Sequence, residues 1–100
     1  MEGGSTLYGL IGQLKAASGK RDALIAILLE NGRDAQMPGC LSYQIAKDVE
    51  DPDIIWVTEV WETQEYHKQS LNLPSVQEAI LKARPIIAGF GLRFETEPVL

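Results

Sequence analysis

The side chain best suited to acid–base chemistry is His67, the only histidine in the chain. An imidazole has an unperturbed pKa of about 6.5, so at neutral pH it can accept a proton from a phenolic hydroxyl. On a short helix beside Lys68 and Gln69, the same side chain could equally be solvated. His67 is therefore a candidate catalytic base, provided that the fold places it beside a ligand.

Trp61 precedes this histidine by six residues. Its flat indole could form the wall of an aromatic pocket and offers an N–H donor to a ligand. Trp56 on the same segment offers the same chemistry. The alternative for both is packing in the core or an interface, the usual place of aromatic residues on central strands. Trp61 is the second catalytic candidate, and Trp56 is a substrate-binding candidate.

Glu59 is the most polar residue on an apolar strand face that also carries Val57 and Trp61. A buried carboxylate must find a partner, or its pKa rises. Arg93 is a candidate partner, within the chain or across an interface between two copies, and a role in proton transfer is the alternative. Tyr66 could donate a hydrogen bond to a substrate oxygen, although packing is the more common role of tyrosine. Glu59 and Tyr66 are substrate-binding candidates.

Several other chemistries lack support in the sequence. The acidic residues between positions 48 and 53 lack the spacing of a calcium loop and are expected to form a solvated turn. The chain contains no phosphate loop, dinucleotide fingerprint or metal-ligand spacing, so no metal or cofactor is expected. A formal charge of −5, with nine scattered basic residues, argues against nucleic acid as a partner.

The composition predicts a cytoplasmic protein. A lone Cys40 cannot form an internal disulfide, and no apolar run approaches the roughly 20 residues of a membrane span or resembles a signal peptide. Residues 1–5 are expected to be a flexible start or a cloning remnant. Residues 6–100 are expected to form one domain, in a chain with 45% apolar and 23% charged residues.

The elements that must position these side chains follow from periodicity and capping signals. Strands are predicted at residues 7–14, 41–46 and 54–62, and the last two should form a hairpin. A helix should follow Ser18, weaken at Asn31-Gly32 and end at residues 37–39. A short helix capped by Thr63 should precede another that restarts at Pro74 and stops by Gly89. Phe90, Leu92 and Phe94 should form one face of a closing strand.

This order predicts an α+β, ferredoxin-like βαββαβ domain with an antiparallel sheet. Two strands, at residues 7–14 and 54–62, are apolar on both faces, which suits the central positions of that sheet. One helical layer covers only one face of the sheet. The other face is therefore expected to pair with a second copy in an isologous homodimer.

These residues resemble the antibiotic biosynthesis monooxygenase (ABM) family over about residues 7–98. The resemblance rests on the order and spacing of several short segments, namely residues 38–43, Asp51-Pro52, residues 56–59, Val60-Trp61-Glu62, residues 83–85 and Ala88-Gly89-Phe90. It implies a ferredoxin-like chain that pairs into a dimeric α/β barrel. It also implies an enzyme that oxidises a small aromatic substrate, a quinol or phenol, with molecular oxygen and without metal or flavin, although some members have no demonstrated reaction.

The resemblance also suggests roles for individual residues. The Trp that ends the third strand in the aromatic-polyketide oxygenases corresponds to Trp61, and the phenol six residues later corresponds to His67. An Asn of that group corresponds to Val57. Its helical Arg falls near Leu81, one turn from Arg84, which makes Arg84 a further substrate-binding candidate.

Three functions follow as hypotheses. The first is a cofactor-independent monooxygenase acting on a quinol or phenol, and the second is a non-catalytic dimeric binding or structural module. The third, a haem-degrading enzyme, is disfavoured because the Asn, Trp and His of that branch fall near Gly12, Ser70 and Ile80.

Overall fold

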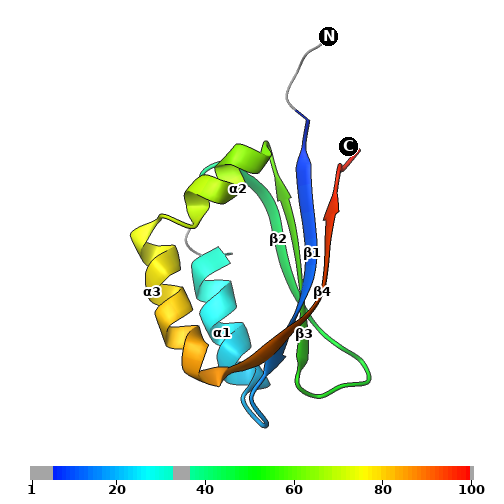
Figure 1. The fold of residues 1–100 in the computed structure, drawn as a ribbon, viewed down its shortest axis with the longest axis vertical. Coiled ribbons are helices and arrows are strands. Elements are labelled where there is room, and N and C mark those ends of the chain that lie inside the picture. Colours follow the sequence, from blue (N-terminus) through cyan, green and yellow to red (C-terminus); the bar gives the residue numbers. More distant parts are fainter. Residues whose placement is uncertain (1–5, 33–36, 100) are drawn as a thin grey trace.

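The computed structural model describes residues 6–32 and 37–99 (Figure 1). The predicted flexible start, residues 1–5, lies outside the described residues. The elements follow the predicted order, with a short 3-10 turn before the last strand: β1 (Tyr8–Ala16), α1 (Arg21–Gly32), β2 (Cys40–Lys47), β3 (Ile54–Trp61), α2 (Gln64–Ser70), α3 (Pro74–Ala83), η1 (Arg84–Ile86) and β4 (Ile87–Thr96).

The four strands form one antiparallel sheet in the order β2-β3-β1-β4. The two strands that are apolar on both faces, β1 and β3, are therefore central, as predicted. All three α-helices lie on the same face of this sheet (Figure 1). These observations confirm the ferredoxin-like arrangement.

Local signals placed the starts of α2 and α3 correctly, whereas α1 begins at Arg21, not directly after the predicted cap Ser18, and extends to Gly32. The hydroxyl of Thr63 accepts a hydrogen bond from the backbone N–H of Tyr66 and so caps α2. Pro74 occupies the first turn of α3, where its missing N–H is harmless. None of the described helices has the length and hydropathy of a membrane span.

The closing strand differs from the prediction in two respects. Gly89 does not stop a helix, because it lies inside β4, where it pairs with Lys15. The alternation of Phe90, Leu92 and Phe94 is also interrupted, because the register of β1 against β4 shifts between Gly12 and Leu14. Such a bulge transfers the following side chains to the opposite face.

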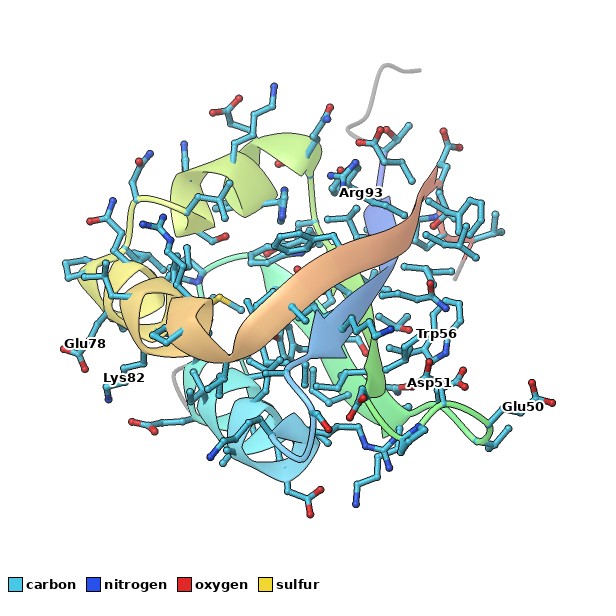
Figure 2. The ribbon with its side chains drawn as sticks, turned by 60° about the horizontal axis from the view of Figure 1, so that its bottom comes forward. Glu50, Asp51, Trp56, Glu78, Lys82 and Arg93 are labelled. Atoms are coloured by element: carbon cyan, nitrogen blue, oxygen red, sulfur yellow. The ribbon has the colours of Figure 1, made fainter. Side chains whose placement is uncertain are left out.

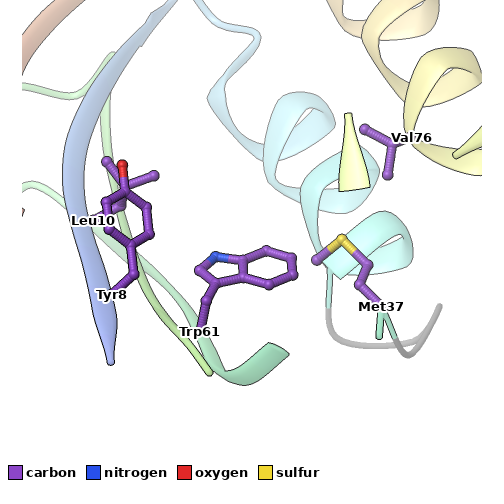
Figure 3. Packing of buried hydrophobic residues seen from close by; sticks show 5 residues of the cluster. All are labelled: Tyr8, Leu10, Met37, Trp61 and Val76. Carbon is purple, nitrogen blue, oxygen red and sulfur yellow. The ribbon is translucent and has the colours of Figure 1, made fainter. Parts of the chain in front are cut away.

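The helix-facing core consists of two buried clusters. One contains Ala16, Leu24, Ile55 and Ala83, and it packs α1 and α3 against the sheet. The other contains Tyr8, Leu10, Met37, Trp61 and Val76. Figure 3 shows Trp61 reaching from the sheet toward Met37 and Val76. The second cluster is the part of the core that lies nearest to α2.

The opposite face of the sheet carries no helix (Figure 1). Ile11 lies at its centre, paired with Thr58 on β3 and Phe94 on β4. Phe94 is 50% exposed and Leu92 is 55% exposed. The predicted pairing of this face with a second copy stays a prediction.

The hairpin between β2 and β3 is stabilised by hydrogen bonds among its own residues. The carboxylate of Asp48 accepts hydrogen bonds from the backbone N–H groups of Glu50 and Asp51 and, at 2.9 Å, from the Trp56 indole. These bonds, the one from Asp51 first, lower the pKa of Asp48. Figure 2 shows Trp56 beside this hairpin, away from the helices. The acidic residues thus stabilise a turn.

Candidate functional site

Three aromatic rings meet where α2 crosses the ends of the two central strands. Tyr8 and Trp61 are paired neighbours on β1 and β3. The ring of His67 lies 5.5 Å from the Tyr8 ring, at an interplanar angle of 39°, and 5.5 Å from the Trp61 ring, at 67°. Trp61 is only 1% exposed. The six-residue spacing of Trp61 and His67 in the sequence therefore corresponds to a direct contact between strand and helix.

The local sequence explains how His67 reaches this position. Trp61 ends β3, Thr63 starts α2, and His67 follows one turn later on the side that faces the sheet. The hydroxyl of Ser70 donates a 2.6 Å hydrogen bond to the backbone carbonyl of His67. The histidine is half-buried, and this rules out the fully solvated alternative.

Burial lowers the pKa of His67 below its ordinary value, and the positive charge of Arg93 lowers it further. The carboxylate of Glu95 acts in the opposite direction. At neutral pH the imidazole is therefore neutral, the state that a proton acceptor requires.

Glu59 lies on the helix-facing side of β3 and accepts a 2.9 Å hydrogen bond from the Trp61 indole nitrogen. Burial raises the pKa of this carboxyl, while the hydrogen bond from Trp61 and the charge of Arg93 oppose that rise. The partner predicted for Glu59 was Arg93. Among the described residues, however, the ion pair of Arg93 is with Glu95, at 4.0 Å, so the indole is the partner in contact with Glu59.

Tyr8 and Glu95 form a contact that sequence reasoning did not find. The Tyr8 hydroxyl donates a 2.5 Å hydrogen bond to the Glu95 carboxylate, which lies 87 positions away in the chain. The alternation in the last strand placed Phe94 and Glu95 on opposite faces without indicating which face meets the helices. Because Leu10 pairs with Glu95, however, the helix-facing side of β4 carries Glu95, and the outer side carries Phe94.

The remaining predicted site residues lie elsewhere. Trp56 lies on the opposite face of the sheet, bound to Asp48. The Tyr66 ring packs over Gly39, where an added Cβ would overlap it. Arg84 caps α3 and lines an open cavity of about 400 Å³ with Ile80 and Phe90. The structure thus brings together His67, Trp61 and Glu59, and it separates them from Trp56 and Arg84.

Two of the three rings are buried, since Trp61 is 1% and Tyr8 is 8% exposed. Two cavities in the described part of the chain are lined by other residues: one of about 160 Å³ lies between α1 and α3, and the other lies beside Arg84. Within residues 6–32 and 37–99, no group of three or more His, Cys, Asp or Glu side chains is arranged to hold a metal ion.

The chain also matches known proteins. The family model described as "Antibiotic biosynthesis monooxygenase" matches residues 7–81. A crystal structure from Chloroflexus aurantiacus, provisionally assigned to the same class, shares 57% sequence identity over 94% of each chain, with a TM-score of 0.89. No curated protein matches significantly.

More distant structures share the fold. A Caulobacter crescentus protein with the same provisional assignment is 20% identical, covers 96% of this chain and 92% of its own, and has a TM-score of 0.85. A Pseudomonas aeruginosa protein is 19% identical, covers 99% of this chain and 100% of its own, and has a TM-score of 0.82. At such identities the likeness extends to the fold alone.

Proposed function

Since this chain belongs to the antibiotic biosynthesis monooxygenase family, we propose that it is a cofactor-independent monooxygenase that oxidises a small quinol or phenol with molecular oxygen. The observation that carries the proposal is the contact of His67 with Trp61 and Tyr8, which places the only imidazole of the chain against two aromatic rings. A flat aromatic substrate suits such surroundings.

In the proposed reaction, the neutral His67 removes the proton of a substrate hydroxyl. The resulting phenolate is electron-rich and reacts directly with oxygen. One oxygen atom enters the ring and the other leaves as water, so a phenol becomes a quinone. The proton acceptor is poised for this step because burial keeps the pKa of His67 below its ordinary value.

Trp61 and Glu59 have separate proposed roles. The indole forms a wall against which the substrate ring stacks. The Glu59 carboxylate, already bound by the indole N–H, has remaining acceptor capacity for a second hydroxyl of a quinol. Trp56 and Arg84 take no part in this scheme, because both lie away from the three rings.

Because Trp61 and Tyr8 are buried, a substrate can stack on them only if a neighbouring element moves. We place this movement in α2, which has only seven residues and carries His67. A helix this short has little stability of its own. Its movement would open the space between Trp61 and His67 while the two central strands stay fixed.

The proposed assembly is a homodimer in the cytoplasm, joined through the uncovered face of the sheet. Ile11, Phe94 and Leu92 contribute apolar surface there, which an isologous contact would bury. Neither nucleic acid nor membrane is a proposed partner.

The competing function is a non-catalytic dimeric module of the same fold. It is favoured by the burial of Trp61 and Tyr8 and by Val57, which is apolar where the related oxygenases carry an Asn. Arg84 also lies too far from the cluster to substitute for their helical Arg.

Oxygen consumption by the metal-stripped protein, measured with a panel of reduced quinols and polyphenols, separates these functions. Uptake above the uncatalysed rate that Trp61→Phe and His67→Ala both reduce supports the monooxygenase. No uptake across the panel favours the binding module.

A further inference from the structure

Tyr8 makes two contacts that join different parts of the site. Its ring lies 5.5 Å from the imidazole of His67 on α2, and its hydroxyl donates a 2.5 Å hydrogen bond to Glu95 on β4. The residue itself is 8% exposed on the central strand β1. Tyr8 thus connects the edge strand of the sheet to the candidate base.

The hydrogen bond to Glu95 fixes the ring more firmly than packing alone. A bond from a hydroxyl to a carboxylate is short and about twice as strong as one between neutral groups. Burial raises the pKa of Tyr8, as does this bond to Glu95, so the hydroxyl stays protonated and remains a donor at neutral pH. Arg93 lies 4.0 Å from the other oxygen of the carboxylate.

His67, in contrast, has no side-chain hydrogen bond among the described residues, and its contacts are with rings. Trp61 is held by Glu59 on the same strand, two positions away. Tyr8 is held by Glu95 on a different strand. The imidazole is therefore positioned by two aromatic rings, and each ring is held by a hydrogen bond that it donates to a carboxylate.

We infer that Tyr8 is a positioning residue for His67, held by its hydrogen bond to Glu95. The inference rests on the proposed function, in which His67 removes the substrate proton. Loss of the hydroxyl would free the ring and widen the range of positions of the imidazole. A displacement of about 1 Å at a reacting group can reduce a rate by as much as 100-fold.

The charges around His67 come from three directions. Glu95 and Arg93 act from β4, and β3 contributes Glu59, which is bound to Trp61. Glu65 and Lys68 of α2 itself are exposed. Of these groups, Glu95 holds Tyr8 and Glu59 holds Trp61, the two rings that pack on the imidazole.

Because His67 is the only histidine, its imidazole can be observed directly by NMR in a protein without a histidine tag. Tyr8→Phe keeps the ring and removes the hydroxyl. We expect the His67 C–H signals to move toward their unstructured positions, because the ring currents of a fixed neighbour are averaged. Tyr43→Phe, which removes another core hydroxyl, should leave these signals in place.

Glu95→Gln tests the same bond from the other side. Removing the carboxylate should lower the pKa of His67, since Glu95 raises it, whereas Glu97→Gln at an exposed position should leave it unchanged. In the oxygen assay, Tyr8→Phe should lower kcat about tenfold with little change in KM, because positioning is lost and binding is not.

Unchanged His67 signals in Tyr8→Phe would overturn the inference whatever the activity. If the wild-type protein consumes no oxygen, the proposed function fails, while the NMR comparison still decides whether Tyr8 positions His67. The two failures are thus distinguishable.

Discussion

The Trp61 indole donates its N–H to the carboxylate of Glu59, two positions earlier on the same strand face, at 2.9 Å. The half-buried carboxylate and the N–H group of the fully buried indole thereby each have a hydrogen-bond partner within the core. This pairing makes both residues structural as well as candidates for chemistry, so their variants need readouts of both kinds.

Trp61→Phe should lower the free energy of unfolding by about 1–3 kcal/mol, because the Glu59 carboxylate loses its donor in a buried place. Chemical denaturation followed by circular dichroism measures this loss. Trp56→Phe is the matched control, since Trp56 donates to Asp48 at the hairpin, and it should destabilise the protein less. Equal losses would contradict the burial argument.

Glu59 should also make stability depend on pH. Burial raises its pKa above the ordinary value of 4.5, so the folded state holds the proton more tightly than the unfolded chain. The stability that the protonated Glu59 contributes is fully present below the pKa of the unfolded chain, and it is lost as the pH rises through the pKa of the folded state. The difference in free energy of unfolding between Glu59→Gln and wild type should therefore shift in favour of the variant as the pH rises from acidic to neutral. Denaturation at several pH values, with Glu97→Gln as control, tests this expectation.

If His67 is the base, the rate of oxygen consumption should fall as the pH becomes acidic. Burial and Arg93 lower the pKa of His67 below 6.5, so kcat/KM should be independent of this group above pH 6.5 and decline as pH falls through the lowered value. His67→Ala should reduce activity at least tenfold, since general bases contribute about 10²–10⁴-fold. An acid limb that persists in His67→Ala would assign the titration to another group.

Gly39 should not tolerate a side chain. Its φ is +78°, and an added Cβ would overlap the Tyr66 ring. Gly19 has a similar φ of +75° but open space around it. Gly39→Ala should thus destabilise the protein by about 1 kcal/mol or more beyond Gly19→Ala, as overpacking does. Adding Tyr66→Ala should reduce that difference without removing it, because the Cβ of residue 66 remains 2.6 Å from the added atom, and an unchanged difference would exclude the Tyr66 ring as its cause.

The proposed dimer depends on Ile11 at the centre of the uncovered sheet face. Ile11→Lys should produce monomers in light scattering at micromolar concentration, because a charge would be buried in the interface. Leu81→Lys, at an exposed position on α3, should leave the assembly unchanged. A wild-type protein that is already monomeric would refute the dimer itself.

The features of the fold that depend on local sequence patterns were predicted correctly. The two-faced apolarity of residues 54–62 and of β1 placed both strands correctly at the centre of the sheet. Thr63 and Pro74 marked the starts of α2 and α3. These features depend on neighbours two to four positions apart, which the sequence displays directly.

The site was only partly accessible to such reasoning. The six-residue spacing of Trp61 and His67 crosses one turn between a strand and a helix, so their contact follows from local geometry. The positions of Arg84 and Trp56 away from these two residues could not be predicted, because packing decides which end of a helix and which face of a sheet meets the cluster.

Sequence alone thus determined the order of the elements and the central strands, and it named His67 and Trp61 as candidates without predicting their contact. Only the tertiary structure decided that Tyr8 donates a hydrogen bond to Glu95 and that the charge of Arg93 lowers the pKa of His67. Those contacts depend on the register of β1 against β4, which includes a bulge near Gly12. A shift of one residue there would turn Glu95 to the other face of the sheet, and no local pattern specifies a register between segments so distant in the chain.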